Sequence, residues 1–198
     1  MEATSEVKPN SVAAFNRSSE ADGPIAVITA LKLRARPYPD RVFAGILFFP
    51  YSSLQEVSAG VSAMAARTAD PKITMHVVNQ GPGMGMPDHG ARPGVGIMMY
   101  DARGEAHARS KEGFQWAFEL PGVQVGPMGE MSLRQVNALA ETFRDYQGSN
   151  IFWLSAPLIA GLDDETLVRA WQWYEECVRL HEGLGAGSSV VFEFMQEV

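Results

Sequence analysis

The sequence predicts an α+β fold in which an antiparallel β-sheet carries α-helices on one face, a layout of ferredoxin-like flavour. Three observations support this class. The 198 residues are 46% hydrophobic and 20% charged, which is an ordinary globular composition. Stretches with strand character are separated by stretches with helical spacing. The strand stretches alternate apolar and polar side chains, which is typical of antiparallel strands with one solvated face.

The first elements are predicted from side-chain alternation and capping. Residues 25–36 place Leu and Ala on one side and Lys and Arg on the other, as a half-exposed strand does. The segment VFAGILFF (42–49) is apolar on both faces and is therefore expected to be a central strand. The pattern Ser53-x-x-Glu56 is a capping box, and apolar residues follow it at helical spacing. A helix is expected from there to about Thr68.

A hairpin is predicted over residues 73–101. The segments ITMHVVNQ (73–80) and VGIMMYD (95–101) have strand character, and a Gly- and Pro-rich loop (81–94) joins them. That loop lacks a Lys-Ser/Thr pair and leads into a strand, so a hairpin tip fits better than a phosphate-binding loop.

The second half of the chain is expected to hold three helices and two strands. A short helix is expected within 104–118, and 119–131 is expected to be irregular. Ser132 and Asp163 are helix N-caps. The predicted elements of the last part are a helix from Ser132 to about Tyr146, a strand at 149–157, a helix after Asp163, a glycine cap at 184–188 and a strand at 189–197.

Composition also limits location and partners. Residues 1–22 read as a mobile leader without the features of a signal peptide, so one domain is expected over 23–198. The net charge of −7 gives no general attraction to nucleic acid, and no apolar run is long enough to cross a membrane. A cytoplasmic location is the default expectation. One cysteine, Cys177, and four scattered histidines give no metal-ligand spacing.

Candidate functional side chains lie on the strands. His76, in the middle of a strand, is either a hydrogen-bonded structural residue or a general base. Trp153 and Glu193 belong to strands that mix aromatic and polar groups. On a sheet face without helices such a mixture could contact a flat ligand, or it could simply face water.

Three segments resemble a known family. Residues 23–50 are similar to the junction that enters the substrate domain of berberine-bridge-enzyme-like FAD-linked oxidoreductases, of the vanillyl-alcohol-oxidase/PCMH superfamily. VGPMGEM (125–131) looks like the Gly-Pro-Met segment of that family. Residues 150–176 are similar to its strand, loop and following helix.

The resemblance implies a flavoprotein substrate-binding domain of secondary metabolism. In this family a hydride passes from a small organic substrate to FAD, which O2 reoxidises. The FAD-binding domain with its Gly-rich diphosphate loop has no counterpart here, so the chain would be a truncated or split enzyme with a missing FAD-domain partner. The catalytic residues are not identified. The backbone of Ala26, Val27 and Ile28 would contact FAD, and the substrate contacts would be His76, Tyr100, Trp153 and Glu193.

Two other functions remain open. The domain could be a cofactor-free small-molecule binder or cyclase, or a non-catalytic module that forms a homodimer through an exposed sheet face. Weak or absent FAD binding is expected in every case, with a dissociation constant no better than about 0.1 mM. The reason is that a diphosphate needs a row of backbone N–H donors at a Gly-rich turn.

Overall fold

The structure is a computed structural model that describes residues 38–67, 70–81, 94–139 and 163–194. Internal contacts divide the chain into residues 1–38 and residues 39–198, and every element described below belongs to the second unit. The predicted strands at 25–36 and 149–157 and most of the loop 81–94 lie outside the described residues.

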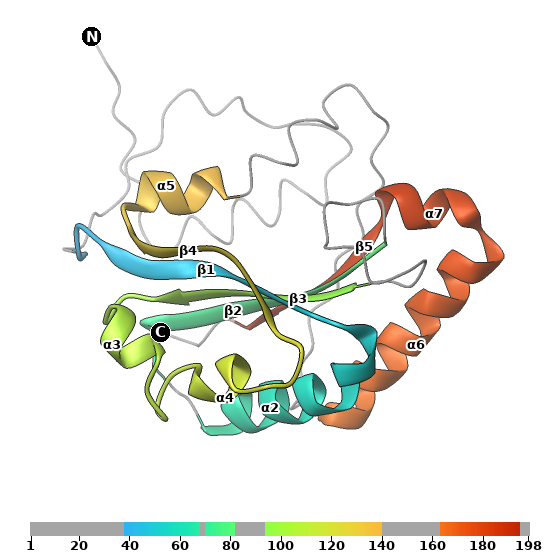
Figure 1. Cartoon of the computed structure of the whole chain (residues 1–198), viewed down its shortest axis with the longest axis horizontal. Coiled ribbons are helices and arrows are strands. Elements are labelled where there is room, and N and C mark those ends of the chain that lie inside the picture. The colour runs from blue at the N-terminus through green and yellow to red at the C-terminus, as the bar shows by residue number, and fades with distance from the viewer. Residues whose placement is uncertain (1–37, 68–69, 82–93, 140–162, 195–198) are drawn as a thin grey trace, which may run out of the picture. The chain divides into compact units, whose positions relative to one another are not determined.

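Five antiparallel strands form one sheet in the order β4-β1-β3-β2-β5 (Figure 1). This confirms the predicted α+β class, the central position of residues 42–49 and the hairpin over 73–101. The strands are β1 (Val42–Phe49), β2 (Ile73–Gln80), β3 (Gly94–Asp101), β4 (Gln124–Met131) and β5 (Ser189–Phe194).

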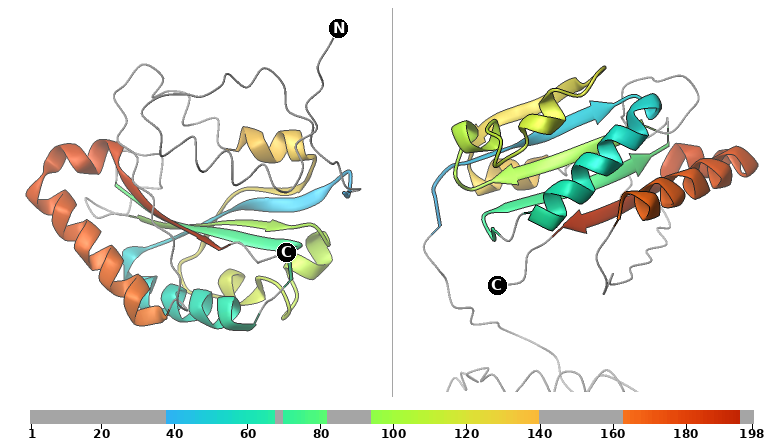
Figure 2. Two further views of the ribbon diagram at one scale, coloured as in Figure 1. Left: turned by 180° about the vertical axis from the view of Figure 1, so that it is seen from behind. Right: turned by 90° about the horizontal axis from the view of Figure 1, so that it is seen from below.

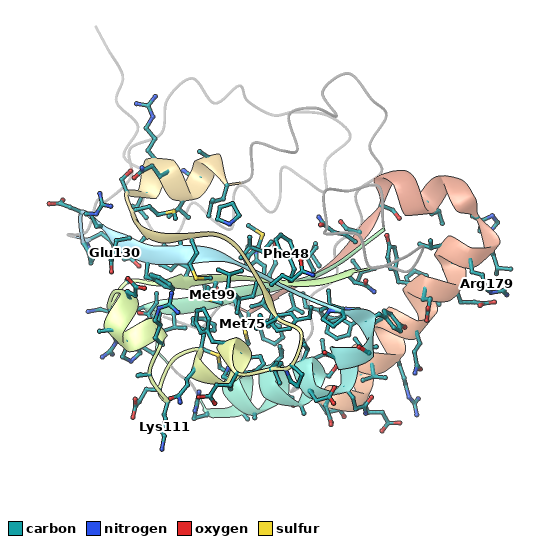
Figure 3. The ribbon with its side chains drawn as sticks, viewed as in Figure 1. Phe48, Met75, Met99, Lys111, Glu130 and Arg179 are labelled. Carbon is teal, nitrogen blue, oxygen red and sulfur yellow. The ribbon has the colours of Figure 1, made fainter. Side chains whose placement is uncertain are left out.

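One face of the sheet carries the hydrophobic core. Alternate residues of β1, including Phe43, Leu47 and Phe49, are fully buried beneath the helices. The helices on this face are α2 (Leu54–Arg67), α4 (Gln115–Phe118) and α6 (Asp164–Leu180), and Figure 2 shows α2 and α6 lying along the sheet. In Figure 3 the labelled Met75 points to the same side. Because successive strand side chains alternate, the intervening residues point to the other face.

Helix α5 (Leu133–Ala138) lies on the opposite side of the sheet from α2 and α4 (Figure 1). The prediction that helices cover one face therefore holds for the large helices and fails for α5. Ser132 begins α5 with a complete capping box, in which its side chain accepts from Gln135 N–H and the Gln135 side chain accepts from Ser132 N–H. The Ser132 cap is thus confirmed. The rest of the helix expected up to Tyr146 lies outside the described residues.

Two predictions about helix ends need correction. Ser53 lies in a single 3₁₀ turn, η2 (Tyr51–Ser53), and its hydroxyl donates to the Pro121 carbonyl at 3.2 Å instead of capping α2. Residues 184–188, expected as a glycine cap, belong mostly to a short helix, α7 (Glu182–Gly187). The Asp163 cap of α6 is confirmed, because its carboxylate accepts from Thr166 N–H at 2.7 Å.

Two predictions for residues 104–131 were also wrong. The expected single helix consists of two short ones, α3 (Glu105–Ala108) and α4. The expected irregular segment contains β4, whose pairing with β1 has a bulge: Gly126 and Pro127 both lie opposite Ile46. Gly and Pro at a bulge obscure a strand pattern, since the ladder is interrupted there.

Candidate functional site

A pocket of about 210 Å³ lies between the second face of the sheet and α5. Its lining is mostly apolar and is contributed by three strands and one helix. The described lining residues are Ala44, Gly45, Thr74, His76, Met98, Met99, Tyr100, Val136 and Leu139.

Strand register brings the polar side chains of this face together. His76 in β2 pairs directly with Met98 in β3 on one side and with Glu193 in β5 on the other. Tyr100 pairs with Thr74, two residues from His76 on the same face. Directly opposed residues have Cβ atoms about 4.5–5.5 Å apart, and diagonal neighbours are about 7–8 Å apart. One ligand could therefore contact His76 and Tyr100 at once.

The solvent exposure of these side chains increases from the pocket toward the edge strand. His76 and Tyr100 are half-buried, whereas Glu193 on the edge strand is exposed. Fully buried Ala44 lies opposite Tyr100 on β1 and leaves room above the sheet. An apolar wall with a few polar groups at one side suits a flat organic ligand, which the polar groups would orient.

The size of the pocket limits what it can enclose. Sites for drug-sized ligands usually have about 300–1,000 Å³. At about 210 Å³, this pocket suits a small ligand or one end of a larger flat one. Its lining among the described residues contains no Lys or Arg, so the pocket offers no cationic side chain for a phosphate group.

The predicted substrate contacts fall into three groups. His76 and Tyr100 line the pocket. Glu193 shares their face and is adjacent to His76, but it does not line the pocket. Trp153 and the predicted FAD contacts Ala26, Val27 and Ile28 lie outside the described residues.

Sequence reasoning singled out only His76 and Tyr100 of the pocket residues, and it missed Thr74, Val136 and Leu139 among others. Thr74 lies two residues before His76, so strand alternation already placed it on the same face. Val136 and Leu139 belong to the segment expected as a helix after Ser132, and all helices were expected on one face of the sheet. No local signal could have located them on the other face, because the side of the sheet that a helix covers depends on its connections.

A second polar cluster, Asp101 with His107, lies apart from the pocket. The Asp101 side chain is fully buried, and its carboxylate contacts His107 Nδ1 at 2.7 Å and accepts Arg103 N–H at 2.8 Å. Asp101 shares the core face with Phe43 and Ile73, its partners on β1 and β2. The pair therefore links the end of β3 to α3 on the side opposite the pocket, and this position indicates a structural role.

An ion pair beside this cluster also has a structural character. Arg103 Nε lies 2.7 Å from Asp70 Oδ2. Partial burial acts to raise the pKa of Asp70, but hydrogen bonds from the Lys72 backbone and from Arg103 outweigh it and hold that pKa below its ordinary value. Among the described residues, no three His, Cys, Asp or Glu side chains converge as a metal site would require.

Comparisons with protein-family models, with curated proteins and with solved structures found no match to this chain. In the part of the chain that the structure describes, no helix has the length and apolar character needed to cross a bilayer.

Proposed function

We propose that this chain is the substrate-domain portion of an FAD-linked oxidoreductase that moves a hydride from a small organic substrate to a flavin. The observation that carries the proposal is the pocket on the sheet face away from α2, α4 and α6, where His76 and Tyr100 belong to a mostly apolar lining. In the family that the sequence resembles, the flavin and substrate lie against the sheet face that the large helices leave free, and this pocket lies on the corresponding face.

The pocket residues fit a flat ring better than a dinucleotide. Met98 and Ala44 provide apolar area for a planar ligand, while His76 and Tyr100 provide polar atoms at its edge. The diphosphate of FAD finds no cationic partner in the described lining. A separate FAD-binding domain would therefore have to hold the cofactor, and this chain would cover one side of the ring.

The proposed roles of the side chains follow from their positions. The flavin, when bound, supplies the hydride acceptor. His76 would bind a hydroxyl or amine of the substrate and accept its proton. Glu193, directly opposite on β5, would stabilise the resulting imidazolium. Tyr100 would orient the ring edge from β3.

A second candidate, a cofactor-free binder of small apolar molecules, has one observation in its favour. The pocket is small and closed on one side by Val136 and Leu139 of the α5 segment. A compact hydrocarbon-like ligand would fit this volume without any flavin.

Titration of the full chain with riboflavin and with FAD distinguishes these functions. We expect both flavins to bind weakly, with similar dissociation constants of about 0.1 mM or weaker, because only the ring is recognised. Backbone NMR shifts should change at β2 and β3. The variants His76→Ala and Tyr100→Ala should weaken both titrations, whereas Gln172→Ala, at an exposed position on α6, should not.

Three outcomes would contradict the first proposal. FAD binding far tighter than riboflavin binding would mean that phosphate contacts elsewhere dominate. Flavin-induced shifts confined to other elements would exclude the pocket. Pocket shifts with a neutral aromatic probe such as naphthalene, and none with riboflavin, would favour the cofactor-free binder.

A further inference from the structure

Helix α6 exposes an apolar stripe on the side that faces away from the core. Trp173 and Leu180 are 64% and 59% exposed, and the half-buried Cys177 lies between them. The opposite side of the helix is the buried one, with Trp171 at 0% and Tyr174 at 3% exposure. Trp173, Cys177 and Leu180 thus form a continuous apolar strip on the outer side of the helix, which is a surface that a partner can cover.

Charged and small residues lie on the two flanks of Trp173 in an ordered way. With about 100° per residue in an α-helix, Arg169 and Glu176 lie on one flank of Trp173. Ala170 and Cys177 lie on the other flank. Arg169 precedes Trp173 by four positions, and Glu176 follows it by three, so opposite charges stand at nearly equal distances on either side of the Trp.

We propose that this outer stripe of α6 is a homodimer contact, in which two copies of the helix pack antiparallel about a two-fold axis at Trp173. The axis reverses the chain direction, so Arg169 meets Glu176 of the partner subunit on one flank, and the same contact occurs twice. On the other flank Ala170 meets Cys177 of the partner subunit. The central Trp173 side chains pack on each other.

A second copy fits this surface because the surface is complementary to itself. Within one chain Arg169 pairs with Glu165, and Glu176 pairs with Arg179, but both ion pairs are largely exposed. Exposed ion pairs within a helix contribute little, so exchanging them for contacts between helices costs little. Antiparallel packing also places the partly positive N-terminus of each helix beside the partly negative C-terminus of the other. Figure 2 shows α6 at one margin of the helical layer, beside β5.

A single helix pair buries less area than a standard protein–protein interface, so the dimer is expected to be weak and concentration-dependent. Sedimentation equilibrium of the full chain, from about 10 µM to about 1 mM, covers the relevant range of dissociation constants. Trp173→Ala should weaken the dimer at least tenfold, about the effect of removing a central aromatic contact. Gln172→Ala, next to it and exposed but off the stripe, should leave the constant unchanged.

Charge exchange tests the two-fold pairing itself. Arg169→Glu alone and Glu176→Arg alone should each weaken dimerisation, because like charges then face each other. The double variant Arg169→Glu/Glu176→Arg should restore it, although both pairs within the helix are then lost. All of these positions are exposed, so the fold should be retained, and circular dichroism would check it.

The proposal is overturned by a chain that stays monomeric up to the highest concentration. It is equally overturned if Trp173→Ala leaves the dimer dissociation constant unchanged, or if the double charge variant dimerises no more strongly than the two single variants. A dimer that is lost on Val191→Glu, on the pocket side of the sheet, and kept on Trp173→Ala would assign the contact to the sheet face instead.

Discussion

Replacing Gly60 with Ala sets two opposing effects against each other. Gly60 lies inside α2, where Ala is the better helix former by about 0.5–1 kcal/mol. A Cβ at this position, however, would lie 2.2 Å from two ring carbons of Trp116, which packs against α2 from α4. Trp116 cannot retreat freely, because its indole N–H donates to Met64 Sδ at 3.5 Å.

The steric effect should win. Overpacking of a well-filled site typically costs about 1–3 kcal/mol. After the gain in helix propensity, Gly60→Ala should lower the free energy of unfolding by about 1–2 kcal/mol. The melting temperature should fall by about 2–4 °C for each kcal/mol in a chain of this size.

A double-mutant cycle isolates the contact. In a Trp116→Ala background the obstructing ring is absent, so Gly60→Ala should stabilise by about 0.5–1 kcal/mol. Urea unfolding followed by circular dichroism gives the four free energies. Ala59→Gly, at the neighbouring exposed position of α2, calibrates the propensity effect without a steric effect.

Two results would refute this reasoning. One is that Gly60→Ala stabilises the wild-type chain. The other is that its effect is the same with and without the Trp116 ring, because the coupling energy would then be zero.

Three further changes test other contacts. Asp101→Ala should lower the free energy of unfolding by about 2–3 kcal/mol, because it removes the buried acceptor and leaves His107 Nδ1 and the Arg103 N–H without their partner; urea unfolding would show the loss, and a loss below about 0.5 kcal/mol would contradict it. Neither Oδ1 nor Nδ2 of the fully buried Asn79 has a hydrogen-bond partner among the described residues. Asn79→Val should therefore stabilise by about 1–2 kcal/mol, and destabilisation in thermal melts would show that the amide is satisfied. Hydrogen bonds from the Thr166 side chain and backbone hold the pKa of Asp163 below its ordinary value of 3.8. The stability that Asp163 contributes is thus present above that value and is lost as the pH falls through the lower folded pKa. The difference in free energy of unfolding between the wild-type chain and Asp163→Ala should therefore decrease in acid. A difference that does not change with pH would refute the argument.

Much of this fold could be predicted because its signals are local. Residues 73–80 alternate in burial as their side chains alternate in polarity, apart from buried Val78 and Asn79 near the strand end. The caps at Ser132 and Asp163 are hydrogen bonds to a backbone N–H three residues on, so the sequence alone locates them. The family-based expectations for FAD and for the substrate remain predictions.

Strand β4 could not be predicted because its stability comes from contacts distant in sequence, and helix α7 could not because its own residues do not favour a helix. Gly126 fits β4 because the side chains of Ile46 and Phe48 lie so close that a Cβ would meet them at 2.7 Å. Helix α7 has a glycine-rich sequence with poor helix propensity, and it packs beside α6.

In the candidate site, too, some features follow from local sequence and others from contacts between distant segments. Strand alternation is enough to place Thr74 and His76 on one face, because the period of two is a property of each strand. It could not show that His76 lies opposite Glu193, since a slip of one residue in either strand would separate them. Nor could it place α5 over the pocket or join Asp101 to His107. Pairing, register and helix placement depend on hydrogen bonds and packing between distant segments, and these exist only once the whole sheet has formed.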